Sequence, residues 1–244
     1  MQKNNKIKEQ ISSALGESKY DYRKVIIALK EIQDFRKAYL LLNSKKRSYS
    51  LEDHTIMVCQ MFEKYFSTNY TFKEFGIESF RLLLCLHDIG KPYSLKNNEK
   101  EKQWQYTVEL IQKYRDMLPF SKRDYPIAIA LISDDPLGLY IRGKIGLEDA
   151  IARIRDMAST TKLPIQTFMN LLTIYYQVDS GAYTHEGYIG DEEAFTEKPK
   201  LEAVFQKDEN GKLLYSSDKC RLVFSQFIEI RFYQLMEGLH IYHG

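Results

Sequence analysis

The sequence lacks any long apolar run, and this absence limits where the chain can work. None of its apolar stretches approaches the roughly 18 residues that a membrane-spanning helix needs. The N-terminal segment, MQKNNKIKEQISSALGES, also lacks the apolar centre of a secretory signal. We therefore expect a cytoplasmic protein with no membrane partner, although export without an N-terminal signal would leave the same pattern.

An excess of charge of one sign is also absent, and cysteine is scarce. The net charge of +2 gives no general electrostatic reason to expect nucleic acid or an anionic membrane as a partner. Cys59, Cys85 and Cys220 are odd in number and stand among apolar residues. Free buried thiols in a reducing compartment are therefore expected rather than disulfides.

Most of the chain has the apolar spacing of helices. The pair Ser50 and Asp53 resembles a capping box at the start of one helix. The run 82–86 is apolar on every side, which is typical of a helix in the centre of a domain, and Gly90 and Pro92 are expected to end that helix. The expected helices are 5–15, 21–43, 51–66, 76–89, 100–117, 126–134, 146–158, 164–179 and 218–240.

The pattern changes after residue 181. Two short segments, 201–206 and 212–216, flank the turn sequence DENG, which is typical of a β-hairpin. We therefore expect an all-α fold with a small β-hairpin in the C-terminal third. The expected parts are N-terminal helices at 1–47, a core at 48–184, and a hairpin with a C-terminal helix at 185–244, all in one domain.

Four polar residues stand where the helical pattern predicts buried positions. His54 and Asp179 fall on apolar stripes, and His87 and Asp88 end the apolar helix. A buried carboxylate needs a cation, a metal ion or several donors. Taken alone, His54 would be an ordinary core histidine and Asp179 a polar helix end. Together, two imidazoles and two carboxylates favour a divalent metal ion without specifying which one.

The motif around these residues resembles the HD-domain superfamily of metal-dependent phosphohydrolases. The string LHDIGKP contains His87, Asp88 and Lys91; His54 precedes it, and the string VDSGAY, with Asp179, follows it. The resemblance implies an HD-type helical core in which His54, His87, Asp88 and Asp179 bind the ion. It further implies catalytic roles for Asp88 and Lys91, with Lys91 holding a phosphate. The alternative for Lys91 is a charge that complements a helix C-terminus.

The chain departs from many members of that superfamily in its histidine content. Members with two metal ions add two histidines between the dyad and the last aspartate, whereas this chain has none between Asp88 and Asp179. Gln103, Gln105 and the 133–135 segment occupy those regions. We therefore expect a single divalent ion (Mn, Mg, Ni, Co, Fe or Zn). The alternative is a second ion with an oxygen ligand from Asp134 or Asp135.

Other residues are expected to contact the substrate. Arg142 and Lys144 lie in a glycine-containing basic loop suited to phosphate, although a solvated loop is the alternative. Tyr183 follows the last expected ligand and would line the mouth of the site. His185 is a further candidate, as a general acid.

The expected function is hydrolysis of a phosphomonoester or phosphodiester by a metal-activated water. The expected substrate is a nucleotide or a similar small phosphorylated molecule, and cleavage at a nucleic-acid terminus stays open within this class. The alternative is a non-catalytic HD-fold binding or regulatory module that retains a metal or nucleotide site. The absence of the middle histidines motivates this alternative.

Overall fold

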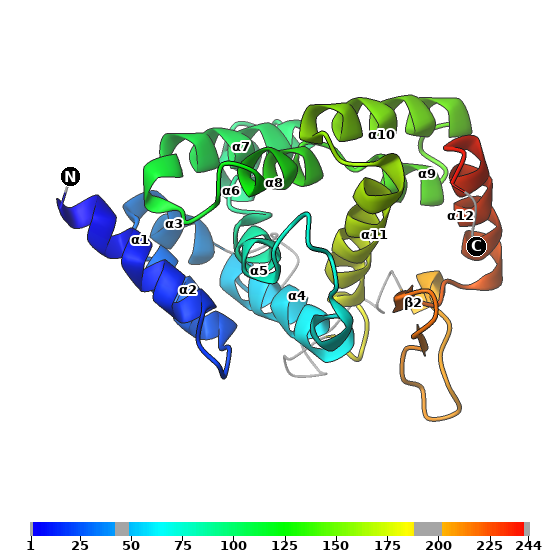
Figure 1. Cartoon of the computed structure of the whole chain (residues 1–244), viewed down its shortest axis with the longest axis horizontal. Coiled ribbons are helices and arrows are strands. Elements are labelled where there is room, and N and C mark those ends of the chain that lie inside the picture. Colours follow the sequence, from blue (N-terminus) through cyan, green and yellow to red (C-terminus); the bar gives the residue numbers. More distant parts are fainter. Residues whose placement is uncertain (1, 42–48, 188–201, 242–244) are drawn as a thin grey trace. The chain divides into compact units, whose positions relative to one another are not determined.

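The computed structural model of the chain describes residues 2–41, 49–187 and 202–241 (Figure 1). Helices dominate these residues, so the predicted all-α fold with a small β-excursion is confirmed. The described residues form two compact units. The first comprises 2–41, 49–59 and 73–133, and the second comprises 60–72, 134–187 and 202–241. The domain boundaries expected after residues 47 and 184 stay a prediction.

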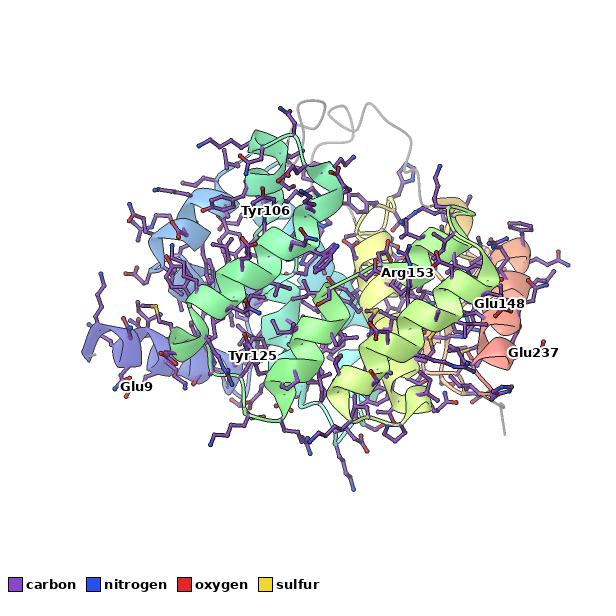
Figure 2. The ribbon with its side chains drawn as sticks, turned by 90° about the horizontal axis from the view of Figure 1, so that it is seen from above. Glu9, Tyr106, Tyr125, Glu148, Arg153 and Glu237 are labelled. Carbon is purple, nitrogen blue, oxygen red and sulfur yellow. The ribbon has the colours of Figure 1, made fainter. Side chains whose placement is uncertain are left out.

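The first unit is built around the apolar helix α5. Each residue from Leu82 to Leu86 is at most 1% exposed, as expected of a central helix. Helix α5 contacts α1, α2 and α8, and α7 lies beside α6 and α8 (Figures 1 and 2). The helices that enter this unit are α1 (Gln2–Leu15), α2 (Tyr22–Leu29), α3 (Gln33–Tyr39), α4 (Leu51–Tyr65, which continues into the second unit), α5 (Ile77–Leu86), α6 (Lys91–Lys96), α7 (Gln103–Lys113) and α8 (Asp124–Ile132).

The continuous helix expected over 21–43 is wrong, because α2 and α3 are separate helices. Ile32, just before α3, has an extended backbone (φ −83°, ψ 116°). The break changes the helical phase, so that Ile32 and Phe35 are both buried. Leu40, expected on the apolar stripe, is instead 66% exposed. Burial of the large Phe35 side chain favours this phase. Residues 42 and 43 lie outside the described residues.

Helix α4 begins with the expected capping box. The backbone N–H and the hydroxyl of Ser50 donate to Asp53 Oδ2 at 2.8 and 2.7 Å. The Asp53 N–H donates back to Ser50 Oγ at 3.2 Å. These reciprocal bonds fix the first turn of the helix. They therefore fix the direction in which His54, the next residue, leaves the backbone.

Helix α5 is shorter than the expected 76–89. It ends at Leu86, with His87 as its C-cap, and a tight turn leads directly into α6. Pro92 lies in the first turn of α6, where its fixed φ is favourable, so it starts a helix rather than ending one. His87 and Asp88 consequently lie in a turn between two helices.

Gly90 allows this turn to lie directly against α7. The Gly90 N–H donates to the Thr107 hydroxyl at 3.0 Å. A Cβ atom added at Gly90 would lie 2.1 Å from the Thr107 backbone nitrogen and 2.6 Å from its hydroxyl oxygen. A larger residue therefore fits only if the backbone moves. This contact fixes the turn that carries His87 and Asp88 relative to the start of α7.

The second unit is organised by α10, which packs against α9, α11 and α12. Helix α9 was not expected from the sequence, which predicted no helix between residues 134 and 146. The helices and strands of the second unit, apart from the end of α4, are α9 (Pro136–Ile141), α10 (Leu147–Thr161), α11 (Ile165–Gly181), β1 (Tyr215–Ser216), β2 (Arg221–Leu222) and α12 (Gln226–Gly238).

The expected turn at 208–211 is present, but the paired strands differ from those predicted. Strand β1 pairs antiparallel with β2, with Tyr215 opposite Leu222. Of the predicted segments 201–206 and 212–216, Gln206 accepts from the Leu214 N–H at 3.0 Å, and an isolated bridge joins Lys207 to Leu213. Phe205 instead forms an isolated bridge with Phe224, and residue 201 lies outside the described residues. Gln177 of α11 explains the difference, because its side chain bonds both the N–H and the carbonyl of Leu222 at 2.8 Å and fixes β2 on α11.

No disulfide joins the three cysteines. Cys59 and Cys85 are buried as expected, with their sulfur atoms 3.8 Å apart. The expectation for Cys220 is wrong, because it lies exposed in the turn between β1 and β2, with φ +48°. Within the described residues, none of the helices has the length and apolar character needed to cross a bilayer.

We expect Gly90→Ala to lower the free energy of unfolding by about 1–3 kcal/mol, because the new methyl group overlaps the α7 backbone. Urea unfolding followed by circular dichroism measures the change. Gly16→Ala is the matched control, since its Cβ would lie 3.5 Å from the nearest atom and should change stability by less than about 0.5 kcal/mol. Equal stability of the two variants would contradict the close-contact argument.

Candidate metal centre

Three of the four predicted metal ligands come together in the first unit. His54 extends from the first turn of α4, and His87 and Asp88 come from the turn after α5. Their residues are only 0%, 4% and 8% exposed. One candidate ligand atom from each residue lies within 4.8 Å of the other two. This group could hold a metal ion.

The distances among these atoms suit a single ion. His54 Nε2 and His87 Nε2 are 3.3 Å apart. Asp88 Oδ2 lies 3.7 Å from the first and 3.8 Å from the second. Metal–ligand bonds of about 2.0–2.1 Å place neighbouring donor atoms of a tetrahedral site roughly 3.3–3.4 Å apart. The three atoms thus need to move by only a few tenths of an ångström to bind one ion.

The protonation of His87 also fits a ligand role. Its Nδ1 lies 2.7 Å from the Leu84 carbonyl oxygen. A carbonyl oxygen can only accept, so Nδ1 must carry the proton. In the neutral ring Nε2 then carries the lone pair, which faces His54 Nε2 at 3.3 Å and which a metal ion would use. Metal-binding histidines typically make this kind of bond with their other nitrogen.

Two further side chains bind the Asp88 carboxylate. Lys91 Nζ donates to Oδ2 at 3.0 Å, and the Gln103 side-chain amide donates to Oδ1. Lys91 begins α6 and Gln103 begins α7. Lys91 therefore lies beside Asp88, and its predicted role toward phosphate stays a prediction. Asp88 meets donors on both of its oxygens.

Asp179 lies near the end of α11, in the second unit. Burial raises the pKa of the nearby Tyr176 to about 12, and the charges of Asp135 and Asp179 act in the same direction. Loss of solvation raises the pKa of Asp135, Arg142 opposes this shift, and the charge of Asp179 adds to it. Asp179 thus belongs to a charged cluster with Asp135 and Arg142. Its role as a metal ligand stays a prediction.

Arg142, a predicted phosphate contact, is fixed by Asp135. Its guanidinium lies 2.7 Å from Asp135 Oδ2, while Asp135 Oδ1 accepts the Gly138 N–H at 3.0 Å and caps α9. One carboxylate therefore connects the start of α9 to the residue that ends it. Tyr183 and His185 lie in the turn after α11, and His185 is exposed.

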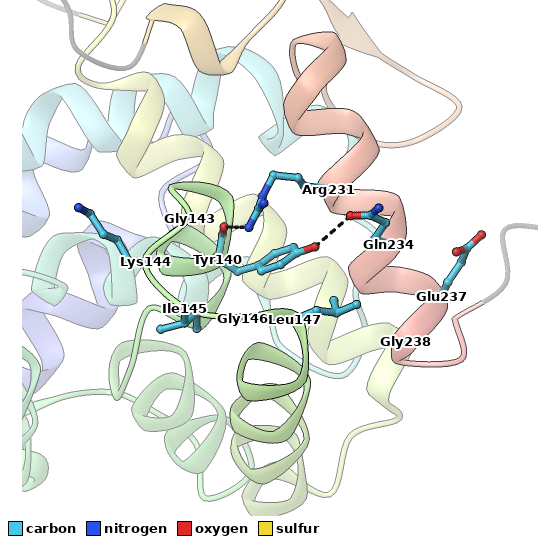
Figure 3. Close-up of a pocket in the computed structure, with 10 residues that line it drawn as sticks. All are labelled: Tyr140, Gly143, Lys144, Ile145, Gly146, Leu147, Arg231, Gln234, Glu237 and Gly238. Atoms are coloured by element: carbon cyan, nitrogen blue, oxygen red, sulfur yellow. Dashed lines mark hydrogen bonds between the residues drawn. The ribbon is translucent and has the colours of Figure 1, made fainter.

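Lys144, the other predicted phosphate contact, lines an open pocket of about 770 Å³ in the second unit (Figure 3). The Arg231 guanidinium lies 4.2 Å from the centre of the Tyr140 ring and donates to the Tyr140 carbonyl at 2.6 Å. The Tyr140 hydroxyl donates to Gln234 at 3.3 Å. Figure 3 shows Lys144 pointing away from Arg231, so the pocket does not direct both cations to one point.

The part that Gln103 plays could not be predicted from the sequence, in which this residue only occupies a region where some members of the superfamily have a histidine. The residue instead bonds Asp88. The available signal was a polar residue one helical turn before Thr107. It points to Asp88 only once Thr107 is known to contact Gly90, and that contact is visible only in the folded chain. Asp135 as the cap of α9 was missed because α9 itself was not expected.

Comparisons with known proteins leave the geometry of this site as the main guide to function. No family model, no curated protein and no solved structure matches the chain. The likeness to the HD-domain superfamily therefore depends on the motif residues alone, and membership of that superfamily stays a prediction.

We expect the neutral His87 ring to be protonated at Nδ1, because its partner there can only accept. Long-range proton–nitrogen correlation spectra of protein labelled with ¹⁵N on histidine would report this tautomer. Exposed His240 is the internal control and should show the usual mixture of tautomers. A His87 ring protonated only at Nε2 would contradict the arrangement.

Proposed function

We propose that the chain is a divalent-metal-dependent phosphohydrolase acting on a nucleotide or a similar small phosphorylated molecule. The observation that carries this proposal is the convergence of two imidazole nitrogens and one carboxylate oxygen at a buried point. The tautomer of His87 supports it, because the bond to Leu84 puts the proton on Nδ1 and the lone pair on Nε2. The string LHDIGKP supports it as well, through its resemblance to the HD-domain superfamily.

In this proposal His54, His87 and Asp88 hold the ion, and Asp179 as a fourth ligand stays the prediction of the sequence motif. Two neutral imidazoles with carboxylates form a donor set for first-row divalent ions such as Mn, Fe, Co, Ni or Zn. A bound divalent ion lowers the pKa of a water molecule and stabilises negative charge on phosphoryl oxygens.

Lys91 is the proposed phosphate-binding group of the site. Hydrolysis forms a P–O bond to water and breaks the ester P–O bond, and the alcohol leaves with a proton. Negative charge on the phosphoryl oxygens needs a nearby cation. The ammonium of Lys91, 3.0 Å from Asp88, is close enough to the ligand group to supply it. Arg142, Lys144 and Tyr183 are proposed as further contacts to the substrate.

Metal analysis tests the ligand set. We expect Asp88→Ala and Asp179→Ala each to weaken the binding of Co²⁺ or Mn²⁺ by at least about 100-fold, because each removes a charged ligand. Asp156→Ala is the control, since Asp156 is exposed and forms no ion pair with any described residue. Unchanged affinity in Asp88→Ala would sink the site. Unchanged affinity in Asp179→Ala alone would reduce the ligand set to the three residues of the first unit.

A substrate screen tests catalysis. We expect the wild-type chain with Mn²⁺, Co²⁺, Ni²⁺ or Mg²⁺ to hydrolyse a nucleotide or a generic phosphodiester, with activity lost in Asp88→Ala and kept in Asp156→Ala. Lys91→Met should reduce turnover while the metal stays bound. Tight metal binding with no turnover of any phosphomonoester or phosphodiester would favour a non-catalytic binding module instead.

A further inference from the structure

The two oxygens of the Asp88 carboxylate have different neighbours. Oδ2 faces the two imidazoles, at 3.7 and 3.8 Å from their Nε2 atoms, and also accepts from Lys91. Oδ1 accepts from the Gln103 amide. One oxygen therefore faces the histidines, and the other is bonded by an uncharged donor.

We propose that Gln103 is a positioning residue that directs Asp88 Oδ2 to one metal ion, and that Lys91 occupies this oxygen until the ion displaces it. The inference rests on the proposed metal site. It assigns opposite effects on metal affinity to two residues that bind the same carboxylate. Gln103 favours the ion, and Lys91 competes with it.

Gln103 is well placed for this role because α7 cannot slide past the Asp88 turn. Gly90 lies against Thr107 so closely that even a methyl group would overlap it. Thr107 follows Gln103 by one helical turn, and its hydroxyl also lies 3.2 Å from the Gln103 carbonyl oxygen. The register of α7 therefore sets where the Gln103 amide lies. An uncharged donor at Oδ1 orients the carboxylate without repelling a cation at Oδ2.

Lys91 neutralises the buried carboxylate while no ion is bound. Its side chain is 16% exposed and that of Asp88 is 11% exposed, so solvent screens this pair only partly. An ion at Oδ2 and an ammonium group on the same oxygen repel each other. Binding of the ion should therefore release Lys91, which is then free to bind a phosphoryl oxygen. The free energy needed to displace Lys91 lowers the metal affinity below the value that the ligands alone would give.

The Gln103 bond also favours one ion at Asp88 over two. A carboxylate that bridges two metal ions commonly uses both oxygens, and the Gln103 N–H competes with a second ion for Oδ1. We therefore expect Asp88 to bind through Oδ2. This agrees with the single ion expected from the scarcity of histidine.

Titration of the full chain with Co²⁺, without substrate, tests the proposal. We expect Gln103→Met, which keeps the length of the side chain but removes the donor, to weaken binding about 10- to 100-fold. We expect Lys91→Met to tighten binding about 3- to 10-fold, because a competing cation is removed. Gln105→Leu on α7 and Lys96→Met on α6 are matched controls, since neither residue bonds Asp88, and both should leave affinity unchanged. Thermal unfolding of each variant is measured in parallel.

The opposite signs separate this role from a structural one, because a destabilised site cannot bind more tightly. Weaker binding in both Gln103→Met and Lys91→Met, or no change in either, would overturn the inference while leaving the proposed function intact. A wild-type chain that binds no divalent ion would overturn both. A stoichiometry of two ions per chain with both held by Asp88 would also overturn the positioning role.

Discussion

The close approach of Gly90 to Thr107 is the contact on which the rest of the site depends. It brings the turn after α5 against the first half of α7 without a side chain between them. The turn carries His87 and Asp88, and α7 carries Gln103, so one steric constraint sets the distances among all three. The Gly90 N–H also finds its acceptor there, which removes the cost of a buried donor. A glycine is thus needed for proximity rather than for an unusual backbone angle.

Charge balance is the second constraint. Asp88 is 8% exposed and would be costly as an isolated carboxylate. Lys91 and Gln103 solve this problem without an ion, and two neutral imidazole nitrogens face the same carboxylate oxygen. The same group can therefore be stable in two states, with an ammonium or with a metal ion beside Oδ2. The binding affinity for an ion depends on the difference between these states, not on the ligands alone.

The sequence predicted the parts of this arrangement that depend on local rules. The capping box at Ser50 and the apolar run of α5 follow from spacing and residue type, and both are confirmed. Local rules failed where tertiary packing decides. The break before α3 buries Phe35 at the expense of helical continuity, and Gln177 on α11 selects β2 as the strand that pairs. Neither effect leaves a signal in the apolar pattern, because each depends on a distant partner.

The early end of α5 is both a failure of the predicted helix and the reason that the site can work. The last four carbonyl groups of a helix have no partner within it, and Leu84 supplies one of them two residues before the end of α5. The His87 ring donates to that carbonyl, which sets its tautomer. Had the helix continued to residue 89, the backbone N–H of Asp88 would have taken this acceptor. The termination of α5 at Leu86 therefore provides the acceptor that turns His87 from a core histidine into a candidate ligand.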